Sequence, residues 1–360
     1  MTSSLDATAT TRAALKTMDR AELEAFAQSL GEPAFRGRQL YTWLVEKGAT
    51  TFEEMTTLPK ALRERLSKIA TLGTIEEVRR QTATDKTVKS LFRLPSGRHV
   101  EAVLIPDFDD DDRAKRLTVC VSSQVGCAMG CHFCATGLMG FHENLTAGQI
   151  LDQVRAMDTL ARERFGRGIT NVVYMGMGEP LQNYANVFKS TQFIRDGFDL
   201  SPKRITVSTV GLARRIRQLA DDDAPFGLAI SLHAPTDPQR SAIMPVNRSE
   251  KTDLAALKDA VQHYHATTGK RVTYEYCMFA DMNDSAADAK NLATVARWAP
   301  SKVNLIMYNP VEGTRFTSTD EARLNRFIRV LVDEGVRVTV RRSRGQDIDA
   351  ACGQLAVQEE

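Results

Sequence analysis

The sequence predicts an α/β fold, a partial (β/α)6-type barrel preceded by a small helical domain. From about residue 117 onward, apolar β-branched runs alternate with amphipathic helical segments, which is typical of βα units around a parallel sheet. Polar motifs follow the ends of these runs, where such folds bind ligands. Leucines at helical spacing between Met18 and Leu72 predict the helical domain. A doubly wound open sheet is the competing topology, because strand counting does not separate the two.

Four segments are expected along the chain. The Ser/Thr/Ala-rich start lacks an apolar stretch, which is typical of a frayed terminus and not of a signal peptide. The predicted segments are a flexible N-terminus (1–17), a helical RNA-binding module with a β connection (18–95), the barrel core (96–345) and a C-terminal tail (346–360).

Strands and helices are predicted from the period of the apolar residues. Two helices carry capping-box patterns, Thr146-x-x-Gln149 and Ser318-x-x-Glu321. The predicted strands are Leu117–Ser122, Asn171–Met175, Arg204–Thr209, Gly227–Leu232, Val272–Met278, Val303–Tyr308 and Arg337–Arg342. The predicted helices are Ala147–Arg164, Ala185–Asp196, Ala213–Asp221, Asp253–Thr267, Ser285–Trp298 and Asp320–Glu334.

Composition narrows the class of protein. With 360 residues the chain is long enough to bury a large core, which excludes a small disulfide-stapled scaffold. No apolar run is long enough to span a bilayer, and we expect no membrane contact and a cytoplasmic location. The net charge of +2 gives no strong electrostatic argument for a nucleic-acid partner.

Three of the six cysteines, Cys127, Cys131 and Cys134, lie within eight residues. In a cytosolic chain such clustering is typical of metal binding rather than of disulfides. A structural zinc site takes four ligands, whereas three cysteines hold a cubic 4Fe-4S cluster and leave its fourth iron open. The pattern favours the iron-sulfur cluster. Zinc with Cys120 or His132 as the fourth ligand is the alternative.

This loop, with Phe133 before its last cysteine, resembles the radical-SAM signature, which implies a radical-SAM barrel. Four further motifs are similar to the RlmN/Cfr family of RNA adenine methyltransferases, and the similarity covers nearly the whole chain. These motifs are Cys120-Val-Ser-Ser-Gln-Val-Gly-Cys127, Gly176-Met-Gly-Glu-Pro180, Ser231-Leu-His-Ala-Pro235 and Asp347-Ile-Asp-Ala-Ala-Cys-Gly-Gln-Leu355.

The resemblance implies a 4Fe-4S cluster on the three cysteines and S-adenosylmethionine as cofactor, two molecules per turnover. Each residue that would line the cofactor lies at or just after the C-terminal end of a predicted strand, although buried capping would also account for Ser208 or Asn309 alone. Glu179 would accept from the methionine ammonium. The implied lining residues are Gly178, Glu179, Ser208, Ser231, Leu232, His233 and Asn309.

Methyl transfer through a cysteine is also implied by the resemblance. Cys352 matches the cysteine that the family methylates, and from which a 5′-deoxyadenosyl radical then abstracts hydrogen so that a methylene radical adds to adenine. Cys120 matches the thiol that resolves the protein–RNA adduct by forming a disulfide. Glu101 matches the proton acceptor, and a carboxylate on an otherwise apolar strand is costly to bury unpaired. Cys277 matches no role in the family, and we expect it in the core.

Two motifs favour one branch of the family. Glu179-Pro180 and Arg341-Arg-Ser-Arg-Gly345 resemble the branch that methylates carbon 2 of adenine in 23S rRNA and tRNA. The alternative is the branch that methylates carbon 8. The resemblance further implies an electron-donor protein such as a flavodoxin, and we expect a monomer. Two other classes remain alternatives: a non-catalytic zinc-bearing RNA-binding protein and a radical-SAM enzyme for a small molecule.

Overall fold

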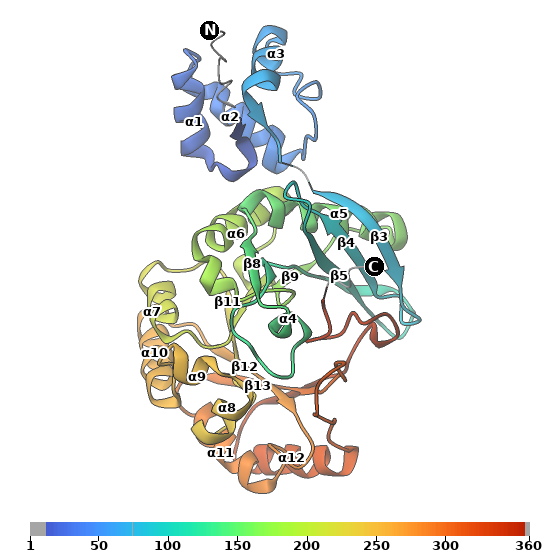
Figure 1. The fold of residues 1–360 in the computed structure, drawn as a ribbon, viewed down its shortest axis with the longest axis vertical. Coiled ribbons are helices and arrows are strands. Elements are labelled where there is room, and N and C mark those ends of the chain that lie inside the picture. Colours follow the sequence, from blue (N-terminus) through green and yellow to red (C-terminus); the bar gives the residue numbers. More distant parts are fainter. Residues whose placement is uncertain (1–11, 74, 357–360) are drawn as a thin grey trace, which may run out of the picture.

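Seven parallel strands form the centre of the protein, for which a computed structural model describes residues 12–73 and 75–356 (Figure 1). Their order in the sheet follows their order in the chain. Right-handed crossovers then place the long helices that connect these strands on the same face, so the sheet curls into a partial barrel. The predicted barrel is confirmed, and the doubly wound alternative, which needs a reversal of strand order, is excluded. The strands are β6 (Ala114–Cys120), β9 (Asn171–Tyr174), β10 (Ile205–Thr209), β11 (Gly227–Ser231), β12 (Val272–Met278), β13 (Ser301–Met307) and β14 (Val338–Arg341).

Long helices cover the outside of the barrel, as the apolar period predicted (Figure 1). Their ends differ from the prediction by at most two residues, and α7 has the predicted bounds. Between β11 and β12 the short helices α8 (Asp237–Ile243) and α9 (Val246–Ser249) were not predicted. The long helices are α5 (Ala147–Phe165), α6 (Tyr184–Phe198), α7 (Ala213–Asp221), α10 (Leu254–Thr268), α11 (Ala286–Ala296) and α12 (Glu321–Asp333).

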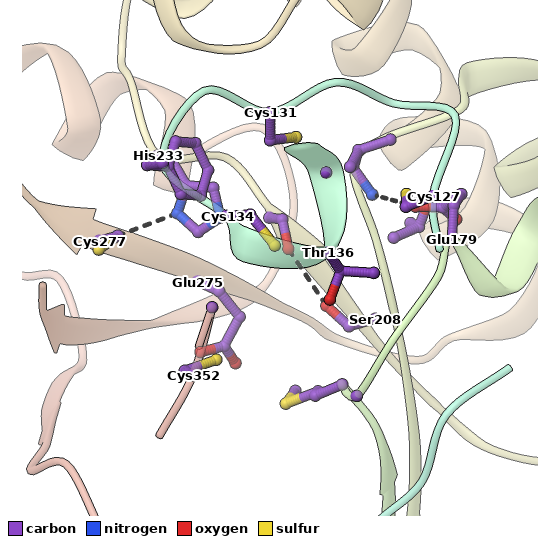
Figure 2. A pocket seen from close by; sticks show the side chains of 18 of the residues that line it. Cys127, Cys131, Cys134, Thr136, Glu179, Ser208, His233, Glu275, Cys277 and Cys352 are labelled. Atoms are coloured by element: carbon purple, nitrogen blue, oxygen red, sulfur yellow. Dashed lines mark hydrogen bonds between the residues drawn. The ribbon is translucent and has the colours of Figure 1, made fainter. Parts of the chain in front are cut away.

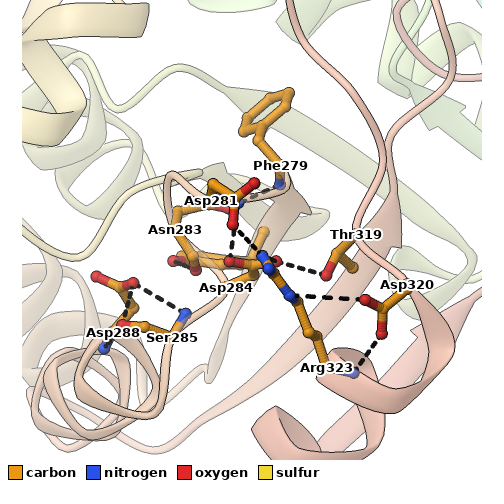
Figure 3. A network of polar contacts seen from close by, with 10 residues as sticks. Phe279, Asp281, Asn283, Asp284, Ser285, Asp288, Thr319, Asp320 and Arg323 are labelled. Carbon is orange, nitrogen blue, oxygen red and sulfur yellow. Dashed lines mark hydrogen bonds and ion pairs between the residues drawn. The ribbon is translucent and has the colours of Figure 1, made fainter.

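The two predicted capping boxes have different outcomes. Thr146 caps α5 together with Gln149, as predicted. The prediction at Ser318 is wrong, because α12 starts after Asp320, whose carboxylate accepts from the Arg323 N–H (Figure 3). An aspartate directly before the first helical residue is a strong N-cap, and it leaves Ser318 to form a bridge with Phe279 instead.

An antiparallel extension widens the barrel sheet to ten strands in the described part of the chain. Strands β3 (Glu76–Thr82), β4 (Val88–Arg93) and β5 (His99–Phe108) continue the sheet from β6. The expected boundary between residues 95 and 96 therefore falls in the turn between two paired strands of one sheet.

The barrel is open between β14 and β6, and the C-terminal segment lies against this opening (Figure 1). Two hydrogen bonds attach the segment to the turn between β3 and β4. The Gly345 N–H donates to Asp85 at 3.0 Å, and the Thr84 N–H donates to Asp347 at 2.9 Å.

The N-terminal module forms a separate lobe above the barrel in Figure 1. Part of the segment expected to be flexible is ordered, because Leu15 is fully buried and the Lys16 ammonium pairs with Asp152 of α5 at 2.7 Å. Residues 1–11 of that segment lie outside the described residues. The module consists of β1 (Ala13–Ala14), α1 (Arg20–Ser29), α2 (Ala34–Tyr41), a π-helical turn (Thr42–Glu46), α3 (Lys60–Ile69) and β2 (Ala70–Thr71). Among the described residues, no helix has the length and apolar character needed to cross a bilayer.

Candidate functional site

A cavity opens inside the barrel at the C-terminal ends of the strands, with a volume of about 1030 Å³ including its mouth. Side chains alternate between the two faces of each strand, so every second residue points into the barrel. This alternation brings residues far apart in the sequence into one layer. The inward residues that line the cavity include Met175, Ser208, Ser231, Glu275, Cys277, Ile306 and Arg341.

Cys127, Cys131 and Cys134 all line this cavity (Figure 2). They come from one loop between β7 (Gln124–Gly126) and the short helix α4 (Ala135–Leu138). The loop is tightly packed at Gly137, where a Cβ atom would lie 2.9 Å from the Cys131 carbonyl oxygen. The three thiols converge on one cavity, as predicted, because the short loop that carries them packs closely against Gly137 of α4.

The donor set suits a cluster better than a single ion. No group of three His, Cys, Asp or Glu side chains in the described ranges is arranged to hold one metal ion. In a cubic 4Fe-4S cluster each thiolate binds a different iron, so its three cysteines do not meet at a point. The zinc alternative lacks its fourth ligand, because His132 Nδ1 lies 3.1 Å from the Ala242 carbonyl and neither His132 nor Cys120 lines the cavity.

Glu179 is buried at the end of β9, beside the cysteine loop. Its carboxylate accepts from the N–H groups of Leu181 at 2.9 Å and Val210 at 2.8 Å. Burial raises the pKa of Glu179 to about 7, against these two bonds. The Thr209 side chain also hydrogen-bonds the carboxylate. A carboxylate has about four lone-pair sites, so it is still able to accept from a cation in the cavity. Gly178 is held at φ 98°, and a Cβ there would lie 2.5 Å from Gln124 Cβ.

Ser208, Ser231 and His233 lie on the adjacent strand ends. The hydroxyl oxygens of Ser208 and Ser231 are 3.3 Å apart. His233 Nδ1 accepts from the Cys277 N–H at 3.0 Å, so the proton of the neutral ring is on Nε2. Burial, with a smaller effect of Arg240, lowers the pKa of His233 to about 3. The ring also packs edge-on against Phe133 of the cysteine loop.

Cys352 is exposed, and it lines the same cavity (Figure 2). Its segment is attached to the cysteine-loop helix, since the Ala135 N–H donates to the Gly353 carbonyl at 2.8 Å and the Thr136 hydroxyl to that of Leu355 at 2.6 Å. Although the residue as a whole is exposed, the protein atoms around its thiol desolvate the thiolate and raise the pKa of Cys352, and the Arg341 guanidinium opposes this effect. The Cys352 thiol therefore reaches the cavity from the C-terminal segment and not from a strand of the barrel.

Four of the predicted residues lie outside the main cavity. Cys120 and Asn309 line a smaller cavity behind Cys352, where the Asn309 amide donates to the Cys352 carbonyl at 3.2 Å. Glu101 lies in a neighbouring polar cavity, paired with Lys89 at 3.0 Å. Leu232 is fully buried. All six cysteines are free, so the structure has no Cys120–Cys352 disulfide.

Sequence reasoning missed two charged residues of the cavity, Glu275 and Arg341. The expectation for Cys277 was incomplete, because this buried residue packs in the core and also lines the cavity. Glu275 lies between two tyrosines within a strongly apolar strand. A single carboxylate on a buried strand was the available signal for it.

Comparisons with known proteins agree with this geometry. Residues 13–72 match the family described as ribosomal RNA large subunit methyltransferase N-terminal domain, and residues 121–293 match the Radical SAM superfamily. A Salinibacter ruber protein named probable dual-specificity RNA methyltransferase RlmN is 60% identical over 97% of this chain and 95% of its own length. The chain belongs to the RlmN family of radical-SAM methyltransferases.

Other RlmN relatives match over similar lengths. The protein of that name from Cytophaga hutchinsonii is 44% identical over 96% of this chain and 93% of its own length. The crystal structure of a radical SAM methyltransferase from Sphaerobacter thermophilus superimposes with a TM-score of 0.87, at 44% identity, over 95% of this chain and 99% of that one. The predicted family, the methyltransferase class and the barrel with its helical N-terminal module are confirmed.

Proposed function

We propose that the protein methylates carbon 2 of a specific adenine in 23S rRNA, and of an adenine in tRNA, through a methylated cysteine. The observation that carries this proposal is the convergence of the three cluster cysteines, Glu179 and Cys352 on one cavity. The relatives named dual-specificity RNA methyltransferase support RNA as the substrate. The other branch of the family methylates carbon 8, and neither the Salinibacter nor the Cytophaga relative carries a name of that branch.

The three cysteines would hold a 4Fe-4S cluster, and Glu179 would orient S-adenosylmethionine by accepting from its ammonium group. When bound, these groups supply the methyl group and the carbon-centred radical, with two cofactor molecules consumed per turnover. The low pKa of His233 keeps its imidazole neutral, so it packs beside the cluster loop without adding charge. The enclosed barrel limits contact of the reactive species with water.

Cys352 accepts the methyl group on sulfur and carries it to the base. In this proposal Cys120 then attacks the Cys352 sulfur, which releases the methylated RNA and leaves a disulfide. Both thiols line the small cavity beside Arg341, which supports such an encounter. Glu101 takes the proton lost from carbon 2. It reaches the C-terminal segment already, by accepting from the Ala356 N–H at 3.1 Å.

A groove on the surface next to the cysteine loop supports an RNA partner. Arg214, Arg215 and Lys251 line it, with one acidic residue, Glu250. The groove also contains Phe141, an aromatic residue that is 45% exposed and available to stack on a base. Cations beside an exposed aromatic side chain suit a nucleic-acid backbone and its bases. We further propose a cytoplasmic monomer reduced by a flavodoxin-like donor.

Mass spectrometry of RNA nucleosides tests the proposal. The cluster-loaded protein is incubated without oxygen with S-adenosylmethionine, a reductant and unmodified rRNA or tRNA. We expect 2-methyladenosine in both RNAs. 8-Methyladenosine would assign the other branch, and unmethylated RNA despite an intact cluster would favour a small-molecule substrate.

A further inference from the structure

Glu275, in the middle of β12, presents a buried carboxylate oxygen to the cavity (Figure 2). The residue is 3% exposed. Its Oε1 accepts from the Asn304 amide at 2.8 Å, whereas Oε2 has no hydrogen-bond partner among the described residues. A buried oxygen without a donor is unfavourable, so a donor from a molecule bound in the cavity would stabilise it.

The groups around Glu275 partly offset the burial of its carboxylate without satisfying Oε2. Burial raises the pKa of Glu275, while the positive charges of Arg341 and Lys302 and the Asn304 hydrogen bond oppose this effect. Arg341 itself donates to the Met175 sulfur at 3.3 Å. The cations therefore compensate the carboxylate from a distance, and its free oxygen faces the cavity.

Glu275 also completes a row of polar side chains across three neighbouring strands. It is the register partner of Ser231 on β11, and the Ser231 hydroxyl lies 3.3 Å from that of Ser208 on β10. Two hydroxyls and a carboxylate in a line are suited to a ligand with adjacent hydroxyl groups. The methionine ammonium is expected at Glu179, near the cysteine loop.

We propose that Oε2 of Glu275 accepts a hydrogen bond from a ribose hydroxyl of S-adenosylmethionine. This makes Glu275 a cofactor-binding residue beyond the set that the sequence motifs indicate, and it rests on the proposed function only for the identity of the cofactor. A ribose offers two neighbouring O–H donors, which match the one unsatisfied acceptor and the serine hydroxyls beside it.

The variant Glu275→Gln tests the acceptor with little change in size. Asn304 donates to Oε1, so it will hold the carbonyl of the new side chain and turn the amide NH2 towards the cavity. A ribose hydroxyl could then only accept from this NH2, and a neutral hydrogen bond would replace the stronger bond to the carboxylate. We expect cluster-loaded Glu275→Gln protein without RNA to bind S-adenosylmethionine at least roughly tenfold more weakly. The exposed variant Glu321→Gln is the control and should bind as the wild type does.

Deoxy analogues of the cofactor identify the donor. The analogue that lacks the hydroxyl bound by Glu275, either 2′-deoxy or 3′-deoxy, should bind the wild type more weakly than S-adenosylmethionine does. Glu275→Gln should bind this analogue and S-adenosylmethionine with nearly equal affinity. An unchanged cofactor affinity in Glu275→Gln overturns the proposal, and so does an analogue penalty that is the same in both proteins. Unchanged cofactor binding with lost RNA methylation would move the donor to the substrate base. Failure of the proposed function would instead appear as wild-type protein that binds the cofactor but leaves RNA unmethylated.

Discussion

Cys352 is the residue on which the proposed chemistry depends most directly. Its thiol lines the cavity together with the cluster cysteines, but the chain reaches it only through the C-terminal segment. We expect Cys352→Ala to abolish methyl transfer to RNA while the iron content and the absorbance near 400 nm stay at wild-type levels. Methylated adenine from this variant at the normal rate would contradict the role of Cys352.

Cys120→Ala should have a different effect. Without the resolving thiol, the RNA should remain covalently attached to Cys352. Denaturing gel electrophoresis after the reaction measures the adduct, which the double variant Cys120→Ala/Cys352→Ala should lack. Free methylated RNA released at the normal rate from the single variant would argue against the disulfide step.

His233 should remain neutral over the physiological range, because burial lowers its pKa to about 3 from an ordinary value of 6.5. The unfolded chain takes up a proton below about pH 6.5 and the folded protein does not, so this residue's contribution to stability is lost as the pH falls from 6.5 towards 3. His233→Asn keeps an acceptor for the Cys277 N–H and tolerates the φ of 56°. We expect its unfolding free energy to depend less steeply on pH between 6.5 and 4. Equal slopes in urea titrations, or an NMR midpoint for His233 above pH 5, would contradict this.

At the residue scale, the sequence predicted most of the cavity residues from their motifs. It missed Glu275, which belongs to no motif, and it did not assign Arg341 to the cavity although this residue begins the Arg341–Gly345 motif. The three cysteines stand in a spacing that indicates a cluster, and Glu179 follows a glycine-rich strand end, whereas Cys352 was assigned from its resemblance to a family motif. Glu275 and Arg341 enter the cavity through the pairing of β12, β13 and β14, which depends on the register of distant strands. Such a register is a tertiary property, and periodicity within one segment does not contain it.

At the scale of single elements, the turn after β9 is fixed by Gly178. Gly178→Ala would place a Cβ 2.5 Å from Gln124 Cβ at a φ of 98°, so the turn that carries Glu179 must move. We expect a loss of about 2 kcal/mol or more in unfolding free energy and weaker cofactor binding. Gly313→Ala is the matched control, because its φ of 78° carries the backbone strain but nothing lies within 4 Å of the added atom. If both variants lose the same unfolding free energy, backbone strain alone explains the loss and the contact with Gln124 does not contribute.

The N-terminal module is fixed to α5 by a buried ion pair. Lys16 and Asp152 are 5% and 8% exposed, and their charged groups are 2.7 Å apart. Lys16→Met would leave the buried Asp152 carboxylate with only the weaker influence of Arg155 as counter-charge, and breaking such a pair costs up to about 3–5 kcal/mol. The double variant Lys16→Met/Asp152→Leu should recover most of this loss, as judged by urea unfolding. A double variant as unstable as the single one would show that the packing of the stems, rather than the charge, dominates.

Helix and strand types were predictable because the apolar period is strong in α5, α7 and β12. The wrong capping box at Ser318 shows the limit of local patterns, since two candidate caps two residues apart compete and tertiary contacts select between them. Residues 13–17 were predicted to be flexible, but they are packed against the protein, and the prediction failed for a related reason. Leu15 and Lys16 are held by α5, which lies more than 130 residues further along the chain.

At the scale of the whole molecule, the barrel was predictable from the number of βα units, but the ten-stranded sheet was not. Four of the seven residues of β3 are charged, so the segment alone resembles a solvated connection, and its pairing with β4 is what makes it a strand of the sheet. The net charge of +2 likewise conceals local asymmetry. Positive side chains collect in the groove between β8 (Phe141–Asn144) and α7, although the chain as a whole is nearly neutral.

That groove gives a prediction for the intact protein. Phe141 and Asn144 of β8 line it, and Figure 1 shows β8 close to α4, the helix that follows the cysteine loop, so RNA bound there would lie near this loop. Removing one cation that pairs with a phosphate should lower the dependence of log K on log salt by about 0.7 to 0.9. Arg214→Gln/Arg215→Gln should therefore weaken RNA binding and flatten its salt dependence, while cofactor affinity stays unchanged. Arg326→Gln/Arg329→Gln on α12 removes the same charge from a distant helix and is the control. If both double variants weaken RNA binding equally, net charge and not the groove governs binding; if only the first does, the groove is the path of the RNA to Cys352.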